Sequence, residues 1–129
     1  MNRSITFYMF IDEFREFCLK KPGVTESTPF GPDTLVFKVM NKVFAITGID
    51  EFEFINLKST PEKAIELRET HEGIRPGWHM NKTHWNSVFT DGSVSNQLIK
   101  ALTDASYDLI VESLPKKTQK ELEVLKARS

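Results

Sequence analysis

The chain has 129 residues, of which 40% are hydrophobic and 27% charged, and its formal net charge is −1 at pH 7. This length and composition are typical of one globular domain that buries a core without disulfides or structural metals, and they exclude a protein whose whole surface is basic. The single cysteine, Cys18, excludes an intramolecular disulfide and favours a reduced, cytoplasmic setting.

A first helix is predicted over about residues 8–20, because Phe10, Phe14, Phe17 and Cys18 recur there at helical spacing. Early acids interrupt this apolar run, and no stretch of the chain reaches the roughly eighteen apolar residues of a transmembrane helix. We therefore expect neither a signal peptide nor a membrane span.

Four strands are predicted next, from the alternation of apolar and polar residues and from the turn residues between them. Asn41 and Lys42 have the two-residue spacing of a hairpin between the second and third of these strands. The short connections indicate an antiparallel meander. The four strands cover about residues 24–30, 34–40, 43–48 and 52–58.

A second helix is predicted from about Pro61 to residues 69–72. Its start has two interpretations. Thr60 caps the helix with Pro61 in the first helical position, or Ser59 caps it and Glu62 closes a capping box. Both interpretations place the helix directly after the fourth strand.

The last part of the chain is predicted to contain a loop, a fifth strand at residues 84–90 and a long helix over about residues 95–113. Pro115 ends that helix, and Thr118 begins a further short one. Strands joined by short turns, with helices before and after them, predict an α+β domain in which helices pack on one face of an antiparallel sheet. We expect residues 1–118 to form this domain and residues 119–129 a short C-terminal helical tail.

The loop at residues 73–85, "GIRPGWHMNKTHW", gathers both tryptophans and two of the three histidines and contains no acid. We expect Trp85 to be mostly buried as an aromatic anchor in the core and Trp78 to be partly exposed. A second acid-free run, "PKKTQK" at residues 115–120, is expected to join the loop in one locally positive face.

Metal binding and catalysis are not favoured by the residue spacing. The three histidines lie eight and five positions apart across a Pro-Gly loop without Cys or acid, so no metal ligand set is predicted. Cys18 lies on an apolar helix stripe and is interpreted as a buried hydrophobe. Ser87 and Ser106 have no evident base, and the nucleotide and hydrolase motifs are missing, so we expect no cofactor and no enzyme.

Four segments resemble the MmcQ/YjbR family: "KPGVTESTPFGPDTLVFKVMNKVFA", "INLKSTPEKAIELRE", "GIRPGWHMNKTHWNSV" and "SYDLIVESLPKK". The third is the most specific, because it combines Arg-Pro-Gly-Trp-His, Asn-Lys and His-Trp-Asn. The resemblance covers about residues 8–118. It implies a CyaY/frataxin-like α+β fold, and DNA binding through a winged arrangement of the sheet. Iron binding of the frataxin type would need a dense acidic ridge, whereas the acids of the first helix are interrupted by bases.

These observations predict a non-enzymatic, cytoplasmic module that binds DNA through a local basic and aromatic patch. The alternative is a non-enzymatic adaptor that binds a protein or a small ligand in the same groove. Lysine and arginine would contact phosphates, and exposed aromatic rings would stack on bases. The predicted nucleic-acid-binding residues are Arg75, Trp78, His79, Lys82, His84, Lys116 and Lys117.

Overall fold

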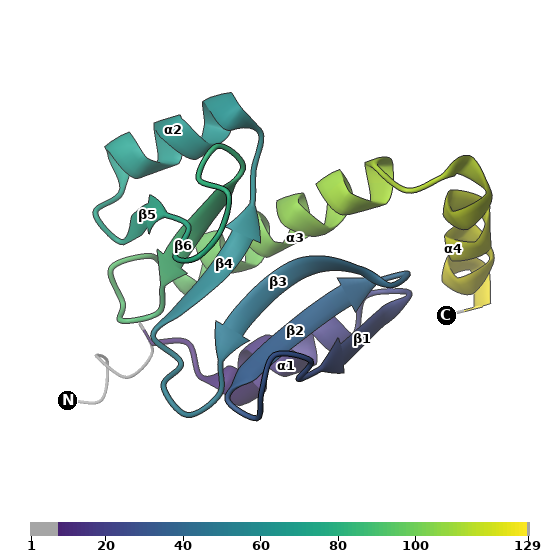
Figure 1. Cartoon of the computed structure of the whole chain (residues 1–129), viewed down its shortest axis with the longest axis horizontal. Helices are drawn as coiled ribbons and strands as arrows, with labels where there is room; N and C mark the ends of the chain where they lie inside the picture. Colours follow the sequence, from purple (N-terminus) through teal and green to yellow (C-terminus); the bar gives the residue numbers. More distant parts are fainter. Residues whose placement is uncertain (1–7, 129) are drawn as a thin grey trace.

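The computed structural model describes residues 8–128. Within them, six strands form one antiparallel sheet in the order β1-β2-β3-β4-β6-β5 (Figure 1). The strands are β1 Val24–Ser27, β2 Thr34–Val39, β3 Lys42–Gly48, β4 Phe54–Lys58, β5 Ile74–Pro76 and β6 Trp85–Phe89. The helices are α1 Ile11–Leu19, α2 Pro61–Thr70, α3 Asn96–Glu112 and α4 Lys116–Arg128. The predicted α+β class and antiparallel sheet are confirmed.

Strand β5 was not predicted, because its residues were assigned to the loop. It is an edge strand of three residues that pairs with β6, with Arg75 opposite Ser87 and Pro76 opposite Asn86. Three residues are too few to show a periodic pattern. A proline is tolerated at this position because an edge strand leaves one side of its backbone unpaired.

The β2–β3 hairpin turns one residue earlier than expected. Met40 and Asn41 have φ angles of 48° and 72°, and two successive left-handed residues are what a tight type I′ hairpin requires. The pairing then shifts between Phe37 and Lys38, which face Ala45 and Val43. This bulge leaves Phe44 without a partner and lets both Phe44 and Ala45 point into the core, where each is fully buried.

The core lies on the face of the sheet that the helices cover. Phe14 of α1 packs edge-on against Phe37 of β2, and Tyr107 of α3 packs edge-on against Phe44 of β3, each with ring centroids 5.5 Å apart. Cys18 is buried in the same cluster, as its place on the apolar stripe predicted. Ala64 and Leu67 of α2 are buried as well, and Leu67 belongs to this cluster, so the prediction of helices on one face is confirmed.

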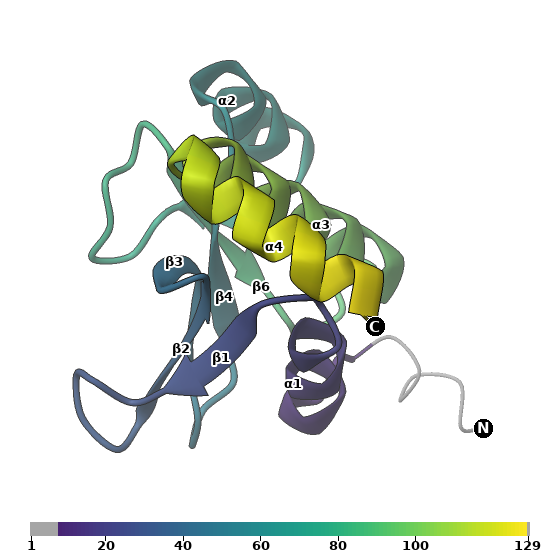
Figure 2. The ribbon, with the colours of Figure 1, turned by 90° about the vertical axis from the view of Figure 1, so that its right-hand side faces the viewer.

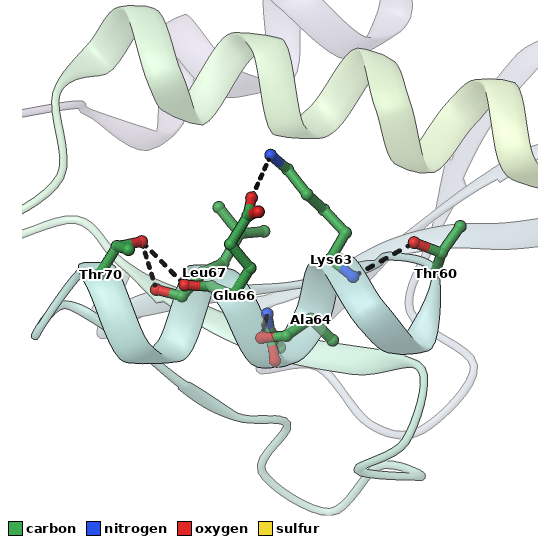
Figure 3. Close-up of polar contacts among 7 residues, drawn as sticks. Thr60, Lys63, Ala64, Glu66, Leu67 and Thr70 are labelled. Atoms are coloured by element: carbon green, nitrogen blue, oxygen red, sulfur yellow. Dashed lines mark hydrogen bonds and ion pairs between the residues drawn. The ribbon is translucent and has the colours of Figure 1, made fainter.

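Helix α2 begins with the first of the two predicted caps. The Thr60 hydroxyl accepts a hydrogen bond from the Lys63 N–H, with Pro61 in the first turn (Figure 3). Lys63 then pairs with Glu66 on the exposed side of the helix. A hydrogen bond also connects this helix to the sheet: the side-chain amide of Asn86 in β6 donates to the Ala64 carbonyl.

Helix α4 starts directly after Pro115 and crosses the predicted boundary between residues 118 and 119 without interruption. Leu122 is its buried residue, 1% exposed, and belongs to the core cluster. Gly23 faces it with a φ of +74°, and a Cβ there would lie 2.8 Å from Leu122 Cδ1. Glycine therefore allows the last helix to pack closely on the segment before β1. Across residues 8–128, no helix is both long and apolar enough to cross a membrane.

Candidate nucleic-acid interface

The face of the sheet opposite the helices is called here the outer face. Its residues follow from the strand register, because side chains of directly opposed residues point to the same side of a sheet. Lys38 lies opposite Val43, Lys58 opposite Trp85, and Arg75 opposite Ser87. Three cations therefore stand among apolar and aromatic residues on this face.

The outer face receives no carboxylate from the strands. Within the six strands the single acidic residue is Glu26, and it is turned toward the helices by Arg15 of α1. The Arg15 guanidinium donates to both carboxylate oxygens, with Nε at 2.8 Å and Nη2 at 2.5 Å. This hydrogen bonding lowers the pKa of Glu26 below its usual value. The strands therefore add no carboxylate to the outer face.

Charge is unevenly distributed along the outer face. Lys38 and Lys58 lie near the C-terminal ends of β2 and β4, so both stand at the same end of the strands. At the opposite end of the strands the turns carry acids, and a hydrogen bond with the Asp50 side chain raises the pKa of the Asp33 carboxyl. An anion approaching the outer face is therefore attracted to the end with the lysines and repelled from the end with the acids.

The loop at residues 77–84 is fixed to the outer face by a closed ring of three hydrogen bonds. The Trp78 N–H donates to Ser87 Oγ at 2.9 Å, and the Ser87 hydroxyl donates to Asn56 Oδ1 at 2.5 Å. Asn56 Nδ2 then donates to the Trp78 carbonyl at 3.1 Å. Because Asn56 and Ser87 are buried residues of β4 and β6, the backbone of Trp78 is held by the sheet itself.

Close packing of the loop depends on Gly77 and Lys82. The Gly77 N–H donates to the Trp85 carbonyl, and a Cβ at Gly77 would lie 2.9 Å from both Cβ and the carbonyl oxygen of Trp85. Lys82 Nζ donates to the Gly77 carbonyl at 2.9 Å. His79 has a φ of +58° in the turn that this lysine closes, a conformation that costs a non-glycine residue about 1–2 kcal/mol.

A groove of about 560 Å³ lies between this loop and the β1–β2 connection. Figure 2 shows both connections on the side of the sheet away from α1 and α3. Trp78 and Phe30 are 63% and 71% exposed at the groove. Its lining contains one titratable side chain, His79, and no Lys, Arg, Asp or Glu. The apolar lining includes Val43, Ile46, Phe54, Met80 and Trp85.

The structure brings four of the predicted site residues together near the outer face. Trp78 and His79 are adjacent, with ring centroids 4.6 Å apart. Lys82 closes the loop beside them. Arg75 lies on β5 with its guanidinium carbon 4.7 Å from the centroid of the Phe89 ring. The pKa of Asp91 is lowered chiefly by hydrogen bonds from Ser93 and to a smaller extent by Arg75, so the charge of Arg75 is partly balanced.

Trp85 is largely buried, as expected, but it does not lie in the core. Its ring lines the groove on the outer face and is not part of the core cluster. The physical reason is the register, because Trp85 pairs with Lys58 and shares the outward alternation of Ser87. Trp78, expected to be partly exposed, is mostly exposed. His84 is half-buried at the start of β6, and its carbonyl accepts the Ser59 N–H.

The single positive face predicted from the two acid-free runs is not formed. Helix α4, which begins at Lys116, and strand β5, which contains Arg75, lie at opposite ends of the molecule (Figure 1). Lys116 and Lys117 are therefore separated from the loop residues. The sequence order could not reveal this, because α3 carries the chain along the length of the sheet before α4 begins.

Sequence reasoning missed Lys38, Lys58 and Phe30, which the fold adds to the outer face and its groove. A signal for the lysines was present in β2 and β4, where the polar residues among the core residues are Thr34, Lys38, Asn56 and Lys58 and none is acidic. Phe30 sits in a connection with Pro29 and Gly31, where periodicity carries no information. Across residues 8–128, no three His, Cys, Asp or Glu residues gather closely enough to hold a metal ion.

These features define a small α+β domain whose antiparallel sheet is covered by helices on one face and open on the other. The chain belongs to the YjbR family, whose family model matches residues 19–109. Escherichia coli O157:H7 YbdF is 38% identical over 109 residues, covering 84% of this chain and 89% of the relative. YjbR of Escherichia coli K12 is 36% identical over 115 residues, covering 88% and 98%.

Solved structures extend this similarity to the fold. A crystal structure of a Deinococcus radiodurans protein with a DUF419 domain superimposes with a TM-score of 0.84 at 38% identity, covering 92% of this chain and 91% of that one. A Pseudomonas syringae protein superimposes with a TM-score of 0.67 at 30% identity, covering 78% and 98%. These similarities establish the family and the fold, and the chemistry of the outer face indicates what the domain can bind.

Proposed function

We propose that the protein is a non-enzymatic nucleic-acid-binding module that uses the outer face of its sheet. The observation that carries the proposal is the combination of Lys38, Lys58 and Arg75 with exposed aromatic rings on a surface to which the strands contribute no carboxylate. Phosphates are bound by lysine and arginine, and bases stack on exposed aromatic side chains.

A binding role is favoured over catalysis because the candidate nucleophiles are occupied. Burial raises the pKa of the Cys18 thiol to about 12, which leaves it protonated at physiological pH. Ser87 is used to hold Trp78. The Ser106 hydroxyl donates to the Phe44 carbonyl and accepts from the Lys58 N–H. The buried thiol also suits the reduced cytoplasmic compartment that forms part of this proposal.

The test is a titration with fluorescent single-stranded and duplex DNA over a range of salt concentrations. If the three cations each neutralise one phosphate, the logarithm of the affinity for a single strand falls with that of salt with a slope of roughly −2. The dissociation constant at physiological salt is expected at about 10⁻⁴ to 10⁻⁶ M, as for non-specific binding.

A pair of double variants locates the surface. Lys38→Gln with Lys58→Gln should reduce the slope to roughly −0.7, since one contact remains. Lys116→Gln with Lys117→Gln removes the same charge from α4 and should leave the slope unchanged. The opposite result would move the binding surface to α4, and absence of binding to every strand at low salt would refute the proposal.

One observation favours a second candidate, an adaptor for a small uncharged ligand or an apolar side chain of a protein. The groove itself is lined by no lysine, arginine or carboxylate, and its size lies within the range of small-molecule sites, about 300–1,000 Å³. Binding to this groove by an uncharged ligand would be nearly independent of salt, which separates it from the nucleic-acid proposal.

A further inference from the structure

The groove and the cations on the outer face differ in what they can bind. The groove offers flat apolar surfaces from Trp78 and Phe30, which are among the most exposed large hydrophobic side chains of residues 8–128. The cations lie outside it: Lys38 is opposite the groove residue Val43, and Lys58 is opposite the groove residue Trp85. A ligand that fits both has a flat, weakly polar part and a negatively charged part beside it.

We propose that the groove seats one unpaired base of a single-stranded nucleic acid, with the neighbouring phosphates on Lys38 and Lys58; this inference rests on the nucleic-acid function proposed above. A base in a duplex is covered on both faces by its neighbours, so it presents edges and phosphates but no face. An unpaired base exposes its faces, and these stack on aromatic side chains.

The charge pattern orients the strand. Lys38 and Lys58 stand at one end of the strands, and Asp33 and Asp50 stand in the turns at the other end. A phosphate backbone therefore runs past the end with the lysines, and the base points from there into the groove. The absence of lysine and arginine in the groove lining agrees with a base there rather than a phosphate.

Trp78 is prepared for stacking before any ligand arrives. Its backbone N–H and carbonyl are both held by the ring of hydrogen bonds through Ser87 and Asn56, while its side chain stays 63% exposed. An aromatic ring on a fixed backbone loses less conformational entropy on binding than one on a free loop. Asn56 and Ser87 are therefore positioning residues, and Trp78 and Phe30 make the contact.

The experiment compares three strands of equal length and sequence: an oligothymidylate, the same strand with abasic sites, and the oligothymidylate paired in a duplex. The abasic strand keeps the phosphates but has no base to stack. Stacking contributes about 1–3 kcal/mol per base, so the oligothymidylate should bind about 5- to 150-fold more tightly than the abasic strand. An oligouridylate tells whether the strand is DNA or RNA, and tighter binding of either than of the abasic strand supports the inference.

Two alanine variants and a matched control test whether the base lies in the groove. Trp78→Ala and Phe30→Ala should each remove most of the difference between the normal and abasic strands, without changing the salt slope. Phe10→Ala is the matched control, because Phe10 is 63% exposed but does not line the groove. In a Trp85→Phe protein, Trp78 is the remaining tryptophan of the two, so its fluorescence should be quenched by the oligothymidylate and not by the abasic strand.

The two proposals fail in different ways. Equal affinity for the normal, abasic and duplex strands, with the expected dependence on salt, would refute base binding in the groove and leave the nucleic-acid function in place. A preference for the normal strand that survives both Trp78→Ala and Phe30→Ala would also refute base binding in the groove. Absence of binding to all of the strands would overturn both proposals.

Discussion

The inner and outer faces of the sheet are built from the same strands but filled differently. On the inner face, Phe37 and Phe44 are fully buried against α1 and α3. On the outer face, Phe54 and Trp85 are half-buried and form part of a groove. Aromatic residues alternate to both sides, so their number does not reveal which side is the core; the positions of the helices decide it.

An aromatic residue in a strand of this sheet therefore contributes either to the stability of the core or to an exposed surface. On the inner face, removal of a ring leaves a cavity among fixed neighbours. On the outer face, removal of a ring exposes surface that was already partly in water, so less free energy is lost.

The largest effect is expected for Phe44→Ala. Phe44 is fully buried and packs against Tyr107, so its truncation should lower the free energy of unfolding by about 3–5 kcal/mol. Denaturant unfolding measures this loss. Phe30→Ala, on the outer side, is the control and should change stability by less than about 0.5 kcal/mol. Similar losses in both variants would show that the two faces do not differ as described.

The second effect concerns the ring of hydrogen bonds that holds Trp78. Ser87→Ala leaves the Trp78 N–H and Asn56 Oδ1 without partners, which should cost about 1–3 kcal/mol in the free energy of unfolding. In a Trp85→Phe background, acrylamide should also quench Trp78 more strongly. Ser27→Ala, at an exposed serine of β1, is the control. An equal loss in that variant would mean that the ring of hydrogen bonds contributes nothing to stability.

Trp85→Ala should have a smaller effect than burial in the core would imply. Because Trp85 lines a groove and part of its apolar surface is in water, its truncation should lower the free energy of unfolding by about 1–2 kcal/mol. Trp78→Ala should change stability by less than about 0.5 kcal/mol. Thermal or denaturant unfolding of both variants tests this order. A loss for Trp85→Ala as large as that for Phe44→Ala would show that Trp85 packs as a core residue.

The smallest effect is expected for Asp33 and Asp50, in the turns at the acidic end of the strands. The hydrogen bond with the Asp50 side chain, and to a smaller extent the charge of Asp50, raise the pKa of Asp33. Because the folded pKa is raised, the contribution of this pair is fully present below the usual carboxyl pKa of about 4 and is lost as the pH rises through the raised value.

Asp33→Asn keeps a neutral partner for Asp50 at every pH. Its melting temperature should therefore exceed that of the wild type at neutral pH by a small amount, and the difference should vanish at low pH. Asp108→Asn, at an exposed aspartate of α3, is the control for a change of net charge. An advantage that grows as the pH falls would contradict this sign.

The candidate site was predictable only in part. The tryptophans, Arg75 and Lys82 stand out because they lie close together in a segment that contains no acidic residue. Lys38 and Lys58 do not stand out, because each is a single lysine in its own strand and only pairing across the sheet brings them to one face. Lys116 and Lys117 were grouped with the loop by composition, but α3 separates them from it.

Sequence alone was sufficient to predict the α+β class, the start of α2 directly after the fourth strand, the burial of Cys18 and the acid-free composition of the loop. These features depend on residues close together in the chain, so spacing and side-chain chemistry are sufficient to predict them. The tertiary structure decided the outward direction of Trp85, the role of Ser87 and Asn56 in holding Trp78, and the separation of α4 from the loop. Those features depend on strand register and on the path of a long helix, and both are set by contacts between residues far apart in the chain.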